Sequence, residues 1–312
     1  MKLLIMKKFI IFFLASSSLL LISCSKDFLD INTNPNAATS AGANLVLPAA
    51  LVNTAARLNP MGAGFNTVMN GWMGYWAISG SYAISSSDFT TYKQTTDFGD
   101  GLFQNAYHNL NDYDYVEQQA KSQSDYFSTA AAKIMKAYNF QILVDLYNNV
   151  PYTEAFKGTT VIHPKYDDAK SIYEDLIKQC DTGINLMKRS DATAPATSDV
   201  LFAGDAAKWR RFGNTLKLRI LMRQSQLSGR TAYIQTEVAK IVTEGSSFLG
   251  TGEDAGVNPG YLNSSGKQNP FYASNFNITG TYINDFWRAN QYSINFYKNN
   301  NDPRLTQVYI RR

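Results

Sequence analysis

The chain has 312 residues and a formal net charge of +4, but Lys2, Lys7 and Lys8 lie in an N-terminal segment that we expect to be cleaved off. The remaining 26 basic and 25 acidic side chains nearly balance, which argues against nucleic acid as a partner, and the length suits one large domain or two smaller ones. Aromatic residues reach 13% while charged residues amount to only 17%, a composition typical of a surface that handles sugars or other nutrients.

Residues 1–23 have the pattern of a bacterial lipoprotein signal peptide. Lys7 and Lys8 precede an apolar run over residues 9–22, which is shorter than the ~20 residues of a permanent membrane span. The run ends in Leu21-Ile22-Ser23-Cys24, the aliphatic, small-residue and cysteine order of a lipobox. We therefore predict cleavage before Cys24 and its lipidation, which anchors the chain because each buried methylene contributes ~0.8 kcal/mol. An ordinary secretory signal with a chance cysteine is the alternative.

The residues after the cysteine predict an outer-membrane tether. Ser25 stands where an aspartate would retain the lipoprotein in the inner membrane. Residues 24–43 are polar and turn-rich around Asn32-Thr33-Asn34-Pro35-Asn36, and the first helix is expected near Leu45. No later stretch is apolar enough to cross a membrane, so we expect one tethered domain over residues 44–312.

Between residues 44 and about 244, apolar side chains recur at helical spacing. The pattern predicts amphipathic helices over residues 125–147, 167–188 and 205–227, joined by short loops into tetratricopeptide-like hairpins. A strict repeat of about 34 residues is absent, so the hairpins are degenerate at most. Cys180 lies on the stripe of Ile172, Leu176, Ile184 and Met187, which predicts a buried and inert thiol without a disulfide partner.

Residues 245–301 differ from this helical part. They are dense in glycine, asparagine, serine and aromatic residues, which indicates either one long elaborated loop or a set of short irregular elements. Loops of this length in a domain are usually functional. The sequence ends soon after Asp302-Pro303-Arg304-Leu305 with no closing helix or strand pattern, and we expect a domain that is incomplete at its C-terminus.

Enzyme signatures are not recognisable in the sequence. The two histidines, His108 and His163, lack a second ligand at zinc spacing, and no nucleophile-elbow motif is present. A glycosidase needs two carboxylates at a set distance in space, which sequence does not reveal. Asp112, Asp114 and Glu117 are expected on a solvated helix face rather than around a calcium ion. We predict a non-enzymatic protein without catalytic residues, metal or cofactor.

Aromatic side chains carry the positive indication of function. Trp72, Tyr75 and Trp76 follow one another at i, i+3 and i+4, which places them on one face of a predicted helix. Flat indole and phenol rings stack on the apolar faces of sugar rings. The alternative is that the rings pack between helices in the core. The candidate ligand-binding residues, from this segment and from the loop-rich part, are Trp72, Tyr75, Trp76, Tyr82, Tyr272, Trp287 and Tyr292.

Several blocks, taken in order, resemble the SusD/RagB family of outer-membrane nutrient-binding lipoproteins. The most specific block is Gly204-Asp205-Ala206-Ala207-Lys208-Trp209. Asn148-Asn149 stands where the family usually has Gly-Asp, a turn that asparagine tolerates. The other matching blocks are residues 24–36, 72–76, 145–155, 164–167, 172–173, 214–219 and 302–305.

The resemblance implies a mostly α fold of tetratricopeptide-like hairpins with an irregular, loop-rich ligand-binding part. It also implies a lid on a SusC-type TonB-dependent transporter at the cell exterior, which captures oligosaccharides or other small nutrients and hands them over unchanged. Within the blocks, Trp209 continues an apolar helix face, while Lys217, Arg219 and Arg223 are expected to pair with carboxylates. The alternatives are a surface glycoside hydrolase lipoprotein and a helical-repeat scaffold that binds other proteins.

Overall fold

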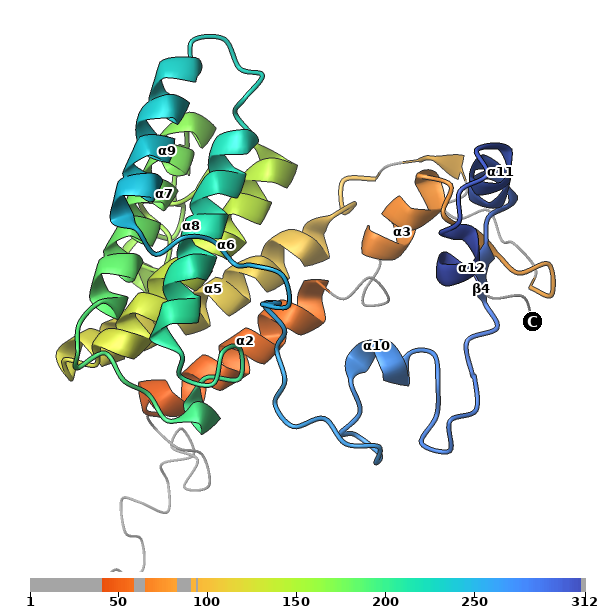
Figure 1. Ribbon diagram of the computed structural model, residues 1–312, viewed down its shortest axis with the longest axis horizontal. Coiled ribbons are helices and arrows are strands. Elements are labelled where there is room, and N and C mark those ends of the chain that lie inside the picture. The colour runs from red at the N-terminus through yellow and green to blue at the C-terminus, as the bar shows by residue number, and fades with distance from the viewer. Residues whose placement is uncertain (1–40, 59–64, 83–90, 94, 310–312) are drawn as a thin grey trace, which may run out of the picture. The chain divides into compact units, whose positions relative to one another are not determined.

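The structure is a computed structural model that describes residues 41–58, 65–82, 91–93 and 95–309 (Figure 1). The signal peptide, Cys24 and the tether up to residue 40 lie outside the described residues, so these assignments stay predictions. Within the described part of the chain, no helix is both long and apolar enough to cross a membrane. The long helices are α2 (Ala43–Leu58), α5 (Asp100–Ser122), α6 (Tyr126–Tyr147), α7 (Ala169–Met187), α8 (Ala206–Met222) and α9 (Thr231–Glu244).

Short elements occur between the long helices and after them. The pairs of strands are β1 with β4 and β2 with β3, both antiparallel. The short elements are α3 (Phe65–Trp72), β1 (Trp76–Ile78), β2 (Val150–Pro151), η2 (Gly158–Thr160), β3 (Tyr166–Asp167), η3 (Ala196–Ser198), α10 (Pro270–Ala273), β4 (Trp287–Ala289), α11 (Gln291–Asn299) and α12 (Leu305–Val308).

The three predicted amphipathic helices are present as α6, α7 and α8, and each begins at an aspartate cap. Asp125 accepts a hydrogen bond from the Ser128 N–H, Asp168 accepts one from Ser171, and Asp205 accepts one from Lys208, each at 2.9 Å. A capping carboxylate satisfies an otherwise free N–H group and places negative charge at the positive end of the helix dipole. These caps explain why the predicted starts are correct to within two residues.

Helix α8 ends at Met222, earlier than the predicted end at residue 227. The reason is a buried contact just beyond the helix, where Arg230 donates two hydrogen bonds to the side-chain oxygen of Gln224, at 3.0 and 2.7 Å. This contact holds the chain in a turn over the residues that the periodic pattern assigned to the helix.

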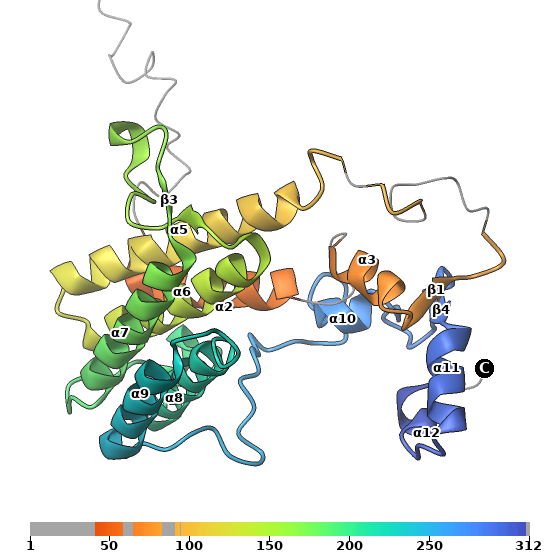
Figure 2. The same cartoon turned by 90° about the horizontal axis from the view of Figure 1, so that it is seen from above.

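The long helices pack in sequence order, α2 on α5, α5 on α6, α6 on α7, α7 on α8 and α8 on α9. Figures 1 and 2 show α5 to α9 side by side in both views. The predicted stripe around Cys180 faces this core, and the Cys180 thiol is fully buried, as predicted. Burial raises the pKa of the thiol well above its usual value, so the reactive thiolate is suppressed.

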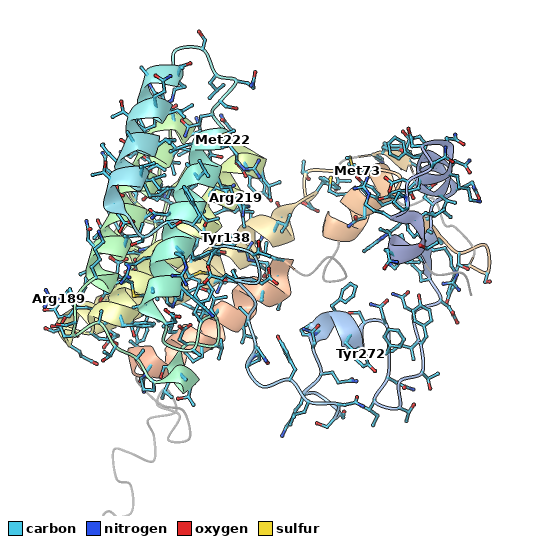
Figure 3. The ribbon with its side chains drawn as sticks, viewed as in Figure 1. Met73, Tyr138, Arg189, Arg219, Met222 and Tyr272 are labelled. Carbon is cyan, nitrogen blue, oxygen red and sulfur yellow. The ribbon has the colours of Figure 1, made fainter. Side chains whose placement is uncertain are left out.

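Of the three basic residues expected to pair with carboxylates, Lys217 of α8 and Arg223, directly after this helix, form ion pairs. The buried ammonium group of Lys217 pairs with Asp181 of α7, and Arg223 pairs with Asp145 at 2.6 Å. The positive charge of Arg219 also acts on the Asp145 carboxylate, and its guanidinium carbon lies 5.3 Å from the ring centroid of Tyr138 (Figure 3). A cation over a ring face is an alternative way to stabilise a charge at a helix junction.

The expectation of a solvated face at Asp112, Asp114 and Glu117 is wrong for Glu117, which is 7% exposed. Helix α6 packs against α5 at this point and supplies two ammonium groups, from Lys133 at 2.9 Å and from Lys136 at 3.2 Å. Burial by itself would raise the pKa of Glu117, but the surrounding ammonium groups outweigh it and lower the pKa to about 2. The carboxylate is therefore an internal ion-pair partner between two helices.

The stretch over residues 245–301 consists of short elements separated by loops, the second of the two expected forms. Within it lie α10, β4, α11 and an isolated bridge between Phe276 and Tyr282. Asparagine side chains cap both helices, with Asn269 accepting from the N–H groups of α10 and Asn290 accepting from Tyr292 of α11. Some of the asparagines in this stretch therefore serve as helix caps.

Candidate functional site

Helix α3 ends at Trp72, so Trp72, Tyr75 and Trp76 do not share a helical face, and that prediction was wrong. Gly74 adopts a left-handed backbone with φ 75°, and Trp76 opens strand β1. A left-handed glycine ends a right-handed helix. The i, i+3, i+4 spacing of the three rings therefore does not reflect a helix, because the chain leaves the helical conformation before Tyr75.

Strand pairing brings Trp76 together with Trp287 from the loop-rich part. In the β1–β4 ribbon, Trp76 pairs with Ala289 and Ile78 pairs with Trp287, so the two tryptophans are diagonal neighbours on one face. Their ring centroids lie 5.9 Å apart with an angle of 42° between the ring planes. Both side chains are half-buried, so part of each indole remains accessible to solvent.

Two further rings extend this surface. Phe286 lies edge-on to Trp287 at 4.8 Å, and Tyr82 lies edge-on to Phe286 at 5.2 Å. Tyr82 and Phe286 are 42% and 38% exposed. The Ser79 N–H donates to the Phe286 carbonyl at 2.8 Å, which ties the two segments together beyond the paired strands. We call Trp76, Tyr82, Phe286 and Trp287 the aromatic platform.

Phe286 is a member of the platform that sequence reasoning missed. Its position directly before Trp287 was the available signal, but residues adjacent in a strand point to opposite faces, so adjacency alone did not favour it. Phe286 precedes the first residue of β4 and reaches Trp287 edge-on from outside the strand. Arg288 follows the strand alternation, and its guanidinium pairs with Asp285 at 3.2 Å.

The other candidates of the first aromatic segment have different surroundings. Trp72 stacks with Tyr92 at 5.3 Å and with Phe98 at 5.6 Å, so much of its ring surface is already in contact with protein. Tyr292 lies against Gly74, where a Cβ atom would come within 2.9 Å of the Tyr292 ring. Tyr75 is 44% exposed and contributes its backbone carbonyl to the Asn290 N–H at 3.0 Å.

Tyr272 belongs to a separate ring cluster in the loop-rich part (Figure 3). It stacks on Phe276 at 5.1 Å with an angle of 26°, and Phe276 meets Tyr282 at 5.5 Å. Tyr272 is 37% exposed, so it remains available to a ligand. Of the seven candidates, the structure joins Trp76, Tyr82 and Trp287 in the platform, while Trp72 and Tyr272 lie in other ring clusters.

The chemistry that the platform offers is stacking combined with hydrogen bonding. Tilted indole faces present apolar area, and the neighbouring Asn284, Asp285 and Asn290 supply polar groups. Among the described residues, no group of three or more histidine, cysteine, aspartate or glutamate side chains is arranged to hold a metal ion. The fold and the platform together define a class, a helical-hairpin protein with a partly exposed aromatic surface on an irregular segment.

The chain belongs to the SusD-like family described as "Starch-binding associating with outer membrane", whose model matches residues 35–312. This match confirms the resemblance to the SusD family. No curated protein sequence matches the chain.

Solved structures share the mostly helical fold at low sequence identity. A SusD/RagB family protein from Bacteroides thetaiotaomicron is 21% identical with a TM-score of 0.67, over 85% of this chain and 53% of that one. A SusD homologue from Bacteroides fragilis is 18% identical with a TM-score of 0.63, over 85% and 52%. A chitin-binding SusD homologue from Flavobacterium johnsoniae is 21% identical with a TM-score of 0.62, over 82% and 53%. The chain therefore spans about half the length of these structures.

Proposed function

We propose that this protein captures oligosaccharides on the aromatic platform without cleaving them. The observation that carries the proposal is the pair of Trp76 and Trp287, held at 5.9 Å on one face of the β1–β4 ribbon. A sugar ring presents a flat C–H face that packs on an indole, and two indoles tilted by 42° follow the curve of a chain of such rings. The exposed Tyr82 adds a further ring, which contacts Phe286 of the platform.

The setting of this capture is an expectation from the sequence and the family. The lipobox at Cys24 supports a lipid anchor, and the family description supports association with the outer membrane. We propose that the anchored protein faces the cell exterior and passes its ligand to a SusC-type TonB-dependent transporter. Protease treatment of intact cells tests the orientation, since an inward-facing protein would stay uncut.

Isothermal titration of the form that starts at Ser25 tests the capture itself. The panel contains malto-oligosaccharides, because the family description names starch, chito-oligosaccharides, because one relative binds chitin, and peptides. We expect saturable binding of an oligosaccharide that is recovered intact. Trp76→Ala or Trp287→Ala should weaken it about tenfold, the effect of losing ~1.4 kcal/mol of ring stacking.

Trp72→Ala is the matched control, because it removes an indole of the same size that is already stacked on Tyr92 and Phe98. We expect it to leave the affinity within about twofold. Cleaved ligand would show an enzyme in place of a binding protein. Equal losses in all three variants would place the site away from the platform.

A further inference from the structure

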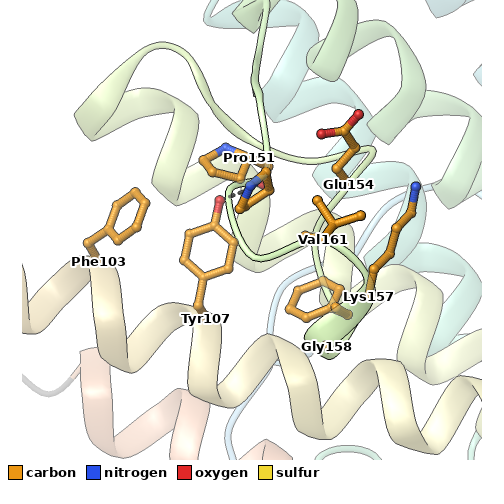
Figure 4. A pocket seen from close by; sticks show the side chains of 10 residues that line it. Phe103, Tyr107, Pro151, Glu154, Lys157, Gly158 and Val161 are labelled. Atoms are coloured by element: carbon orange, nitrogen blue, oxygen red, sulfur yellow. Dashed lines mark hydrogen bonds between the residues drawn. The ribbon is translucent and has the colours of Figure 1, made fainter.

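A pocket, called the hollow below, lies in the helical part, between helix α5 and the segment that connects α6 to α7 (Figure 4). Its volume is about 230 Å³, below the roughly 300–1,000 Å³ of sites for drug-sized ligands. The apolar lining includes Phe103 and Tyr107 from α5 and Phe156 and Val161 from the connecting segment. A hollow of this size suits a ligand with a single ring-sized apolar group.

The aromatic walls of this hollow are held in place by the protein itself. The Tyr107 hydroxyl donates to the Pro151 carbonyl at 2.5 Å, and the Phe103 ring lies 4.8 Å from the Tyr107 ring. Phe156 closes the other side with a left-handed backbone, φ 61°, which is rare for a residue with a bulky side chain. Such a conformation persists only where the surroundings enforce it. The walls are thus organised before any ligand arrives.

Two opposite charges stand at the mouth of the hollow without pairing with each other. Figure 4 shows Glu154 and Lys157 on the side opposite Phe103 and Tyr107. The Glu154 carboxylate accepts one backbone hydrogen bond, from the Lys165 N–H at 2.9 Å. Neither Glu154 nor the Lys157 ammonium has an ion-pair partner among the described residues. Both charges are therefore available to a ligand.

We propose that this hollow binds a small zwitterion with one ring-sized apolar group, the chemistry of a free aromatic amino acid. Its ring would lie in the pocket against Phe103, Tyr107 and Phe156, which contact one another, and edge-on contacts between rings are favourable. Its carboxylate would accept from Lys157 and its ammonium group would donate to Glu154, and charge-assisted bonds of this kind are stronger than neutral ones. A neutral sugar would offer these two groups hydroxyls but no opposite charges, which distinguishes the expected ligand of this pocket from that of the aromatic platform.

Ligand-observed NMR titration of the full chain carrying Cys24→Ala, with L-phenylalanine as the probe, tests the proposal. We expect weak saturable binding, with a Kd of about 1 mM, because exposed charges contribute little each. Lys157→Gln and Glu154→Gln should each weaken phenylalanine binding about three- to fivefold. N-acetyl-phenylalanine amide lacks both charges, and it should bind to the unchanged protein no more tightly than phenylalanine binds to these variants.

Lys178→Gln on α7 is the control for the loss of one exposed lysine, and we expect it to leave the titration unchanged. Absence of saturable phenylalanine binding would overturn the proposal. It would also be overturned if the blocked amide bound as well as the free amino acid, or if Lys157→Gln and Glu154→Gln had no effect. None of these outcomes bears on oligosaccharide capture, which depends on other residues.

Discussion

Asp199, a carboxylate that is 1% exposed, organises the loop that leads into α8. It accepts hydrogen bonds from the backbone N–H groups of Leu201 at 3.1 Å, Phe202 at 3.2 Å and Gly204 at 2.9 Å, and from the Trp209 indole at 2.8 Å. A carboxylate is an acceptor only, so these four donors match its capacity. One side chain therefore joins the loop to the largest ring of the helical core.

We expect Asp199→Ala to lower the free energy of unfolding by about 3–5 kcal/mol, because it leaves buried donors unsatisfied, including the Trp209 indole. Urea denaturation measures the loss. Asp191→Ala is the control, since Asp191 is exposed and pairs with the exposed Arg189, and its removal should leave the denaturation midpoint nearly unchanged. Similar losses in the two variants would contradict the role of Asp199.

At the scale of the elements, a glycine sets the distance between α6 and α7. A Cβ atom on Gly183 would lie 2.7 Å from the Ile134 Cγ1 atom and 3.1 Å from the Ala130 carbonyl oxygen, both on α6. The carbonyl belongs to the helix backbone and cannot rotate away. Gly213 of α8 has a similar position, 2.8 Å from a side-chain carbon of Ile184. The helices approach closely because these positions carry no side chain.

Gly183→Ala should therefore destabilise the protein although alanine favours helix. The gain in helix propensity is about 1 kcal/mol, while overpacking a tight contact costs about 1–3 kcal/mol. The cost should lie near the upper end of this range, because the Ala130 carbonyl oxygen cannot move aside. Gly101→Ala in α5 is the matched control, because the nearest atom to its added Cβ would be 4.0 Å away. Thermal unfolding should show a lower Tm for Gly183→Ala and an equal or higher Tm for Gly101→Ala. A Tm increase in both would show that the helices can separate freely.

For the whole molecule, two paired carboxylates, one buried and one half-buried, make stability depend on pH. Glu117 joins α5 to α6, and Glu244, at the end of α9, pairs with Lys188 at 2.8 Å. For both, burial would raise the pKa, but ammonium groups and hydrogen-bond donors lower it from 4.5 to about 2. A carboxyl whose pKa is lower in the folded state stabilises the fold above its unfolded pKa, and this contribution is lost as the pH falls.

We expect the free energy of unfolding to fall between pH 4.5 and pH 2, with Glu117 alone contributing about 3 kcal/mol of the change. Urea denaturation at a series of pH values measures it. Glu117→Gln should be less stable at pH 7, because Lys133 and Lys136 lose their partner, and should lose less stability on acidification. The same pH dependence in both proteins would show that Glu117 is not responsible.

The helical part could be predicted from the amino-acid sequence, because the relevant information is local. Periodic apolar positions placed α6, α7 and α8, and the stripe around Cys180 correctly predicted a buried thiol. The ion pairs of Lys217 and Arg223 also followed from charged residues on otherwise apolar helices. Helix formation depends on contacts three and four residues apart, which a single sequence displays directly.

Which aromatic residues contact one another could not be predicted from the sequence and became visible in the structure. Trp76 and Trp287 were both candidates, but their pairing depends on a two-stranded ribbon of three residues each, from distant parts of the chain. Sequence reasoning placed Trp76 on a helix, because it weighed the spacing of the rings above the left-handed Gly74. Sequence reasoning also missed Phe286, whose ring contacts Trp287 edge-on in the folded chain. Strand pairing between distant segments is fixed by packing of the whole chain, and no local period reports it.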